Sequence, residues 1–230
     1  MIALTAEGRL RARRHALLAI VCTGATAALV PVLHGDLRER ISTATAYVAL
    51  VLLATTLSLG PLNVLRGRAN PVSFNRRRDF GIWSAIVGVS HAAIGLTVHL
   101  RGRMHLYFFP EPGHPSIAGL RADAFGAAND TGLVAALLLL VLALISNDVA
   151  LRGLGTTRWR TVQRSAYVVL GLAVLHAGLY QLIEKPEWWR VLLFVSATAA
   201  VLTLQTCGVR RQIDRRSSAL IPPAPSGGGQ

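Results

Sequence analysis

The sequence predicts an all-α, polytopic membrane protein built as a bundle of six transmembrane helices. Apolar residues make up 52% of its 230 residues and charged residues only 15%, against roughly 25% charged residues in an ordinary soluble domain. Bursts of arginine separate the apolar runs, and the net charge is +13. Apolar spans joined by cationic loops are typical of membrane proteins. This dispersal of the arginines excludes a nucleic-acid-binding protein, which would gather them on one basic face.

Six apolar runs are each expected to form one spanning helix, since a span needs about 20 mostly apolar residues. The runs lack the alternation of β-barrel strands. The helical domain is predicted to cover residues 15–208, after an N-terminal segment (1–14) and before a largely disordered tail (209–230) that ends in Pro and Gly. The six runs are 15–33, 41–64, 80–100, 131–145 with a start near 124, 161–183 and 188–208.

The first run has an alternative interpretation as a signal peptide. The arginines at 9–14 would form its basic segment, and residues 25–27 resemble a cleavage site. The run is long for the apolar core of a signal peptide, and its removal would spoil the charge pattern described next. An uncleaved first helix is therefore favoured.

The distribution of charge predicts the orientation of the chain. Seventeen of the 24 basic residues fall in the N-terminal segment, in the loops after the second and fourth helices, and in the C-terminal segment. Cytoplasmic loops carry the excess of basic residues, so both termini are expected in the cytoplasm, with the protein in a bacterial-type inner membrane. The acidic residues divide four to seven between the sides, so the whole excess of +13 lies on the cytoplasmic face.

Three of the seven histidines, His91, His99 and His176, fall inside apolar runs. An ionisable group in lipid is costly unless it is paired or ligated, and a neutral imidazole is a common haem ligand. At 1.5 Å per residue, His91 lies about 16 Å along the third helix and His176 about 22 Å along the fifth. Both helices run in the same direction, so the two imidazoles reach a similar depth, as in a six-coordinate haem site. His99 is nearer the outer edge and is expected to snorkel to the interface.

Two glycines share the face of His91 on the third helix. Gly88 and Gly95 lie three residues before and four residues after it. Such glycines either let a flat macrocycle approach or serve ordinary packing between membrane helices. The histidine between them favours the macrocycle.

Four further residues are candidates for the same site. Arg101 or Arg103, at the start of a loop rich in Pro and Gly, would contact haem propionates. Trp83 and Tyr167 could line a haem or quinone pocket. The alternative for the aromatic pair is an interfacial belt.

Two stretches carry a family resemblance. The first, SLGPLNVLRGRANPVSFNRRRDFGIWSAIVGVSHAAIGLTVH, contains His91, and the second, ISNDVALRGLGTTRWRTVQRSAYVVLGLAVLHAGLY, contains His176. They resemble the ferric-reductase-like transmembrane family, most closely its MsrQ-like haem-binding membrane subunits. The matched positions are Pro61, Leu62, Arg77, Arg78, Phe80, Gly81, Ile82 and His91 in the first stretch, and Ser146, Asn147, Arg152, Leu154, Gly155, Trp159, Arg164, Tyr167 and His176 in the second.

The resemblance implies a b-type haem held by His91 and His176 as metal ligands, and electron transfer across the bilayer. The protein would be an oxidoreductase subunit that needs partner proteins. Its electron donor would be a quinone or a flavin on a separate protein, and its acceptor would be extracytoplasmic. Gln163 stands where the family has a further histidine, thirteen residues before the second ligand, so a single haem is expected.

An alternative function belongs to another class. The same fold could serve as a haem-free or degenerate scaffold, or as a transport-related bundle. Gln163 and the absence of a flavin and NAD(P)H domain in the sequence favour that alternative.

Overall fold

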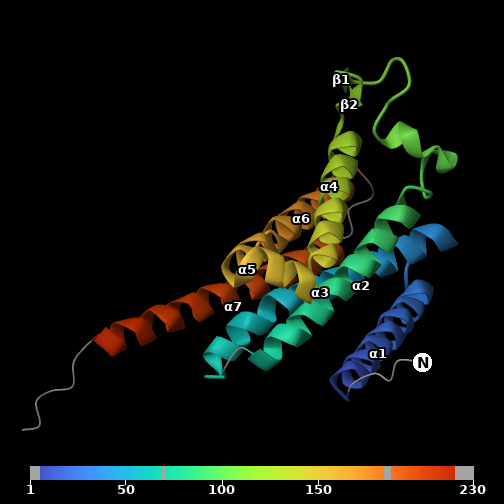
Figure 1. Cartoon of the computed structure of the whole chain (residues 1–230). Helices are drawn as coiled ribbons and strands as arrows, with labels where there is room; N and C mark the ends of the chain where they lie inside the picture. The colour runs from blue at the N-terminus through green and yellow to red at the C-terminus, as the bar shows by residue number, and fades with distance from the viewer. Residues whose placement is uncertain (1–5, 69–70, 184–187, 221–230) are drawn as a thin grey trace, which may run out of the picture.

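The computed structural model describes residues 6–68, 71–183 and 188–220, and most of these residues are helical (Figure 1). The α-helices are α1 (Ala6–Leu29), α2 (Leu37–Leu65), α3 (Pro71–Gly95), α4 (Ala124–Leu144), α5 (Asp148–Gln163), α6 (Ala166–Ile183) and α7 (Trp188–Leu220). Short 3-10 turns are η1 (Val30–Val32), η2 (Leu100–Gly102) and η3 (Met104–Tyr107). Between α3 and α4, β1 (Ser116–Ile117) and β2 (Leu120–Arg121) form a small antiparallel hairpin.

Five helical segments among the described residues are long and apolar enough to cross a membrane. They are Ala6–Val32, Leu37–Leu65, Ala124–Leu144, Asp148–Gln181 and Val191–Arg215. The predicted all-α membrane architecture fits this arrangement. α3 is not among the five, because Arg78, Asp79 and His91 lower its mean hydropathy, yet it packs lengthwise against α2 and also contacts α4. The count of six spans therefore stays a prediction.

Side-chain caps fix where three of the helices begin. Asp36 accepts a hydrogen bond from the Glu39 amide at 2.9 Å and starts α2. Asp123 accepts one from the Gly126 amide at 2.7 Å and starts α4, close to the predicted early start near residue 124. Asn147 caps α5 in the same way. Each cap satisfies an amide that the helix itself leaves without a partner.

The first and last helices extend beyond the predicted apolar runs. α1 begins at Ala6 and α7 continues to Leu220, because the arginines that flank both runs are good helix formers. The first part of the predicted C-terminal tail is thus helical, and residues 221–230 lie outside the described part of the chain. Figure 1 shows the far end of α7 projecting away from the other helices.

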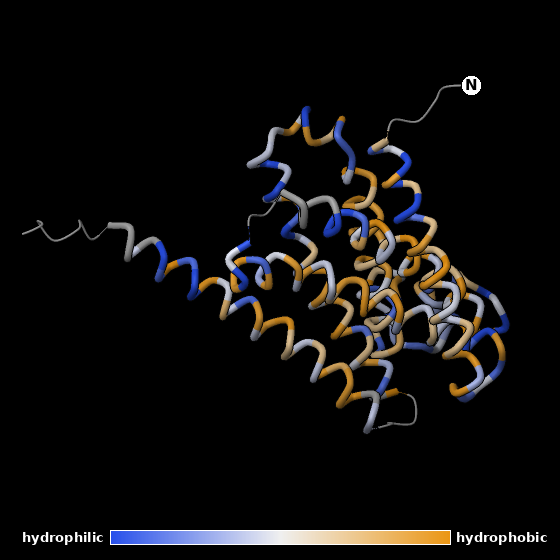
Figure 2. The backbone as a smooth tube through the Cα atoms, turned by 90° about the horizontal axis from the view of Figure 1, so that it is seen from below, coloured by the Kyte–Doolittle hydropathy of each residue, from blue (hydrophilic) through white to orange (hydrophobic). Residues whose placement is uncertain are grey.

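Two buried apolar clusters hold the helices together. The larger lies where α2, α4, α6 and α7 meet, and the smaller joins α1 to α2 and α3. The larger consists of Leu50, Leu53, Leu57, Ala135, Leu142, Ala166, Val169, Leu170 and Val201, and the smaller of Cys22, Val48, Ala49, Leu52 and Val87. The helices are apolar outside as well: Ile20, Leu137 and Leu192 are all about half exposed or more, and Figure 2 shows hydrophobic residues along most of their length. A surface of this kind suits contact with lipid.

Candidate functional site

The structure brings the two predicted ligands together. His91 of α3 and His176 of α6 face each other with their ring centroids 6.1 Å apart and their planes at 75°. Two metal–nitrogen bonds of about 2 Å each, with the two ring radii added, give a centroid separation of about 6 Å for imidazoles on either side of one ion. The separation of the two rings therefore fits two imidazoles that would hold one metal ion, such as a haem iron, between them.

Hydrogen bonds prepare both imidazoles for ligation. The Nδ1 atom of His91 lies 2.9 Å from the carbonyl oxygen of Ser42, and that of His176 lies 2.7 Å from the carbonyl oxygen of Ala128. A carbonyl oxygen can only accept, so each Nδ1–H donates and each Nε2 keeps a free lone pair. Metal-bound histidines are usually held in this way by a second partner. The Ser42 hydroxyl, 3.2 Å from the same Nδ1 of His91, is a further polar neighbour.

A cavity of about 250 Å³ adjoins the pair. α2, α3, α4, α6 and α7 form its walls, which are mainly apolar, and both histidines line it. Ligand sites in proteins are typically apolar clefts with a few polar groups that set orientation. Among the described residues no group of three or more His, Cys, Asp or Glu could hold a metal ion, so this histidine pair is the candidate site.

Glycine allows the close approach of His176 to α4. A Cβ atom on Gly132 would lie 2.6 Å from the Nδ1 atom of His176. The predicted pair, Gly88 and Gly95, does line the cavity. A Cβ on Gly88 would meet Leu139 at 3.0 Å, so this glycine also serves helix packing. Sequence reasoning missed Gly132 because it considered only glycines on the helix of His91.

Aromatic rings gather at the end of the cavity that lies nearest the loop between α3 and α4. His99 stacks on Tyr180 with centroids 6.3 Å apart, and Phe125 meets both rings at 6.0 Å. His99 therefore packs against this cluster, and its place at the membrane interface stays a prediction. The Tyr107 hydroxyl accepts from the His99 amide at 2.8 Å and donates to the Gly95 carbonyl at 3.0 Å. Burial raises the pKa of the Tyr107 hydroxyl, which stays a neutral donor.

The predicted propionate-binding arginines lie away from the cavity. Arg103 forms an exposed ion pair with Glu111, with a 2.7 Å separation between nitrogen and oxygen. Arg101 is exposed in η2, where its φ of 54° turns the chain into the outer loop. Neither arginine lines the cavity.

The predicted aromatic pair also lies elsewhere. Trp83 faces α1, where its indole N–H donates to Nδ1 of His15 at 3.0 Å. Tyr167 is 36% exposed, nine residues and thus about 13 Å before His176 on α6. Neither side chain lines the cavity.

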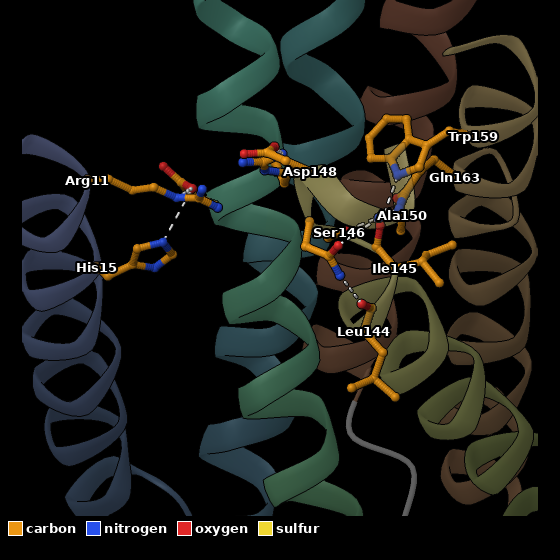
Figure 3. A network of polar contacts seen from close by, with 12 residues as sticks. Arg11, His15, Leu144, Ile145, Ser146, Asp148, Ala150, Trp159 and Gln163 are labelled. Carbon is orange, nitrogen blue, oxygen red and sulfur yellow. Dashed lines mark hydrogen bonds and ion pairs between the residues drawn. The ribbon is translucent and has the colours of Figure 1, made fainter. Parts of the chain in front are cut away.

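The position of the missing histidine is occupied by a hydrogen-bonded glutamine. Gln163 at the end of α5 donates to the Ser146 hydroxyl at 3.1 Å and to the Leu142 carbonyl at 3.3 Å. Beside it, the Trp159 indole donates to the Ile145 carbonyl at 2.9 Å. Figure 3 shows this network tying α5 to the last turn of α4.

A buried carboxylate joins α1 to α3 at the same end of the bundle. The Asp79 side chain is 3% exposed and lies 3.3–3.6 Å from Arg11, Arg14 and the Nε2 atom of His15 (Figure 3). Since Nδ1 of His15 accepts from the Trp83 indole, its Nε2 carries the proton that faces Asp79. His15 was missed because a histidine near a helix end gives no signal in the sequence. Arg78 pairs with Asp148 at 2.6 Å beside this group.

The chain is similar to curated proteins. One is the "Protein-methionine-sulfoxide reductase heme-binding subunit MsrQ" of Ralstonia nicotianae, 27% identical over 173 residues, which are 75% of this chain and 73% of the relative. No family model matches the chain, and no solved structure matches it. This similarity confirms the predicted resemblance to MsrQ-like haem-binding membrane subunits.

Proposed function

We propose that the protein is a b-type haem-binding transmembrane electron-transfer subunit. The observation that carries this proposal is the pair of facing imidazoles, His91 and His176, each with Nδ1–H donated to a backbone carbonyl. The relative named as a haem-binding subunit supports the same cofactor.

A haem held by both imidazoles would supply one-electron transfer and leave no open iron position for a substrate. The residues of this chain do the rest. The carbonyls of Ser42 and Ala128 hold the Nδ1 protons and fix which nitrogen faces the metal. The apolar walls of the cavity keep water from the site, which sets its polarity and so the reduction potential.

We propose a single haem. Gln163 uses its amide nitrogen to join α5 to α4, and an amide side chain is not a haem ligand. At the same end of the bundle, α3 contributes Arg78 and Asp79, which are engaged in ion pairs. These contacts join helices at the inner end, and no residue among them is left to bind a second haem.

We propose that electrons pass from the arginine-rich end of the bundle to the loop between α3 and α4. The pairs Arg11–Asp79 and Arg78–Asp148 bring the starts of α1, α3 and α5 to one end, which the excess of positive charge assigns to the cytoplasm. The donor is a quinone in the bilayer or a flavin on a separate protein. The acceptor is an extracytoplasmic protein, and the membrane is a bacterial-type inner membrane.

Absorption spectra of the purified protein test the proposal. We expect a Soret band that shifts on reduction with dithionite, with one haem per chain. His91→Ala and His176→Ala should each abolish the band, whereas His105→Ala, at an exposed position in η3, should leave it intact. A colourless protein after haem-supplemented expression would contradict the proposal and favour the haem-free scaffold.

A further inference from the structure

We infer that Tyr180 and Asn129 form a clamp between α6 and α4 that positions His176, so that Tyr180 is a positioning residue for this ligand. The part of this inference that concerns ligation rests on the proposed function. The clamp itself rests on contacts between side chains that the structure shows.

The clamp repeats the contact that His176 makes, one helical turn further on. Tyr180 follows His176 by four residues, so both lie on one face of α6, with ring centroids 5.1 Å apart. The Tyr180 hydroxyl donates to Oδ1 of Asn129 at 2.8 Å, and His176 donates to the carbonyl of the preceding residue, Ala128, at 2.7 Å. Two neighbouring residues of α4 thus receive hydrogen bonds from two residues of α6.

Both partners of the clamp are themselves held in place. Nδ2 of Asn129 donates to the Phe125 carbonyl at 2.7 Å, so its Oδ1 is turned toward Tyr180. Asn129 is 7% exposed, and a buried amide oxygen that loses its donor is costly. The Tyr180 ring lies against His99 and Phe125, which restricts its rotation.

The clamp matters for His176 because the residue of α4 that lies against its ring, Gly132, has no side chain. Gly132 provides only backbone beneath the imidazole. The direction of the ring is therefore set by the Ala128 carbonyl and by contact with Tyr180. If the hydroxyl bond is lost, α4 and α6 can separate at this turn, and the acceptor for Nδ1 moves with α4.

Tyr180→Phe tests the clamp, since it removes the hydroxyl and keeps the ring. We expect the purified variant to retain haem with about tenfold lower affinity. The electron paramagnetic resonance spectrum of its ferric form should change, because that spectrum reports the relative orientation of two axial imidazoles. The reduced variant should also bind carbon monoxide, as His176 no longer holds its place, whereas the native protein should exclude it. Asn129→Leu should give the same changes, and the double variant should add nothing.

Thr55→Val is the matched control, because the Thr55 hydroxyl donates only to the Val51 carbonyl of its own helix. It should leave all three measurements as in the native protein. Native spectra and carbon monoxide exclusion in Tyr180→Phe would overturn the inference. If the native protein binds no haem, the proposed function fails, and the clamp is then tested on the haem-free protein. There the ¹⁵N NMR signal of Nδ1 of His176 should move in Tyr180→Phe and stay in Thr55→Val, and an unmoved signal in Tyr180→Phe would overturn the clamp.

Discussion

Two halves of the bundle, named outer and inner after the proposed orientation, use polar side chains in opposite ways. In the outer half, His91 and His176 give their Nδ1 protons to backbone carbonyls and line a cavity. In the inner half, the Gln163 amide donates a hydrogen bond to Ser146, and the Asp79 carboxylate forms an ion pair with Arg14 of α1. A polar group within a membrane bundle is costly unless it has a partner. The inner groups have protein partners, and the outer pair has lone pairs left for a cofactor.

The largest effect is expected from Gly132→Ala, which should disturb the outer half by displacing His176. The added methyl would lie 2.6 Å from the imidazole of His176, and the other two nearest atoms are also in this ring, so His176 must leave its position. We expect loss of the Soret band with the protein still folded by circular dichroism. Gly171→Ala on α6 is the control, since nothing lies within 4 Å of its added Cβ. A normal haem content in Gly132→Ala would show that His176 is not held against α4.

Asp79→Asn should destabilise the inner half and leave the histidine pair of the outer half unchanged. The substitution leaves Arg11, Arg14 and His15 without their shared carboxylate, but these side chains are about a third exposed and regain some solvation. We expect the free energy of unfolding to fall by about 2 kcal/mol, with the haem spectrum unchanged. Thermal unfolding in detergent measures the loss of stability, and the absorption spectrum measures the state of the haem. A shifted Soret band would contradict the separation of the two halves.

Gln163→His tests whether the inner half can be converted into a second haem site. The substitution restores the histidine expected from the family, but Arg78 and Asp79, which α3 contributes to the same end of the bundle, are both engaged in ion pairs. We expect one haem per chain, as before, and a loss of about 1 kcal/mol of stability from the missing hydrogen bonds. The measurement is the ratio of haem to protein, and a ratio near two would refute the structural role of the inner end.

That His91 and His176 come together could be predicted from the sequence, whereas the surroundings of the pair could not. Counting residues along two parallel helices was enough to place His91 and His176 at one depth. The rotation of each helix about its axis could not be predicted, because the sequence of a helix that is apolar all round does not show which face is buried. Trp83 and Tyr167 were therefore assigned to a cavity that they do not line. Gly132, on α4, was missed because nothing in the sequence gives the register of α4 against α6.

The smallest effect concerns the outer cap of α4, the helix that carries the partners of His176. Burial alone would raise the pKa of Asp123, but hydrogen bonds from Arg121 and the Gly126 amide, with the Arg121 charge and that of His114, lower it below its ordinary value. The carboxylate therefore stabilises the folded state fully above its unfolded pKa of about 3.9, and this contribution is lost as the pH falls through the lower, folded pKa. Asp123→Asn keeps the capping oxygen and removes the charge. We expect it to cost about 0.5 kcal/mol at pH 7 and to flatten the acid limb of the stability curve. A stability difference from the native protein that persists unchanged at pH 2 would assign the effect to packing.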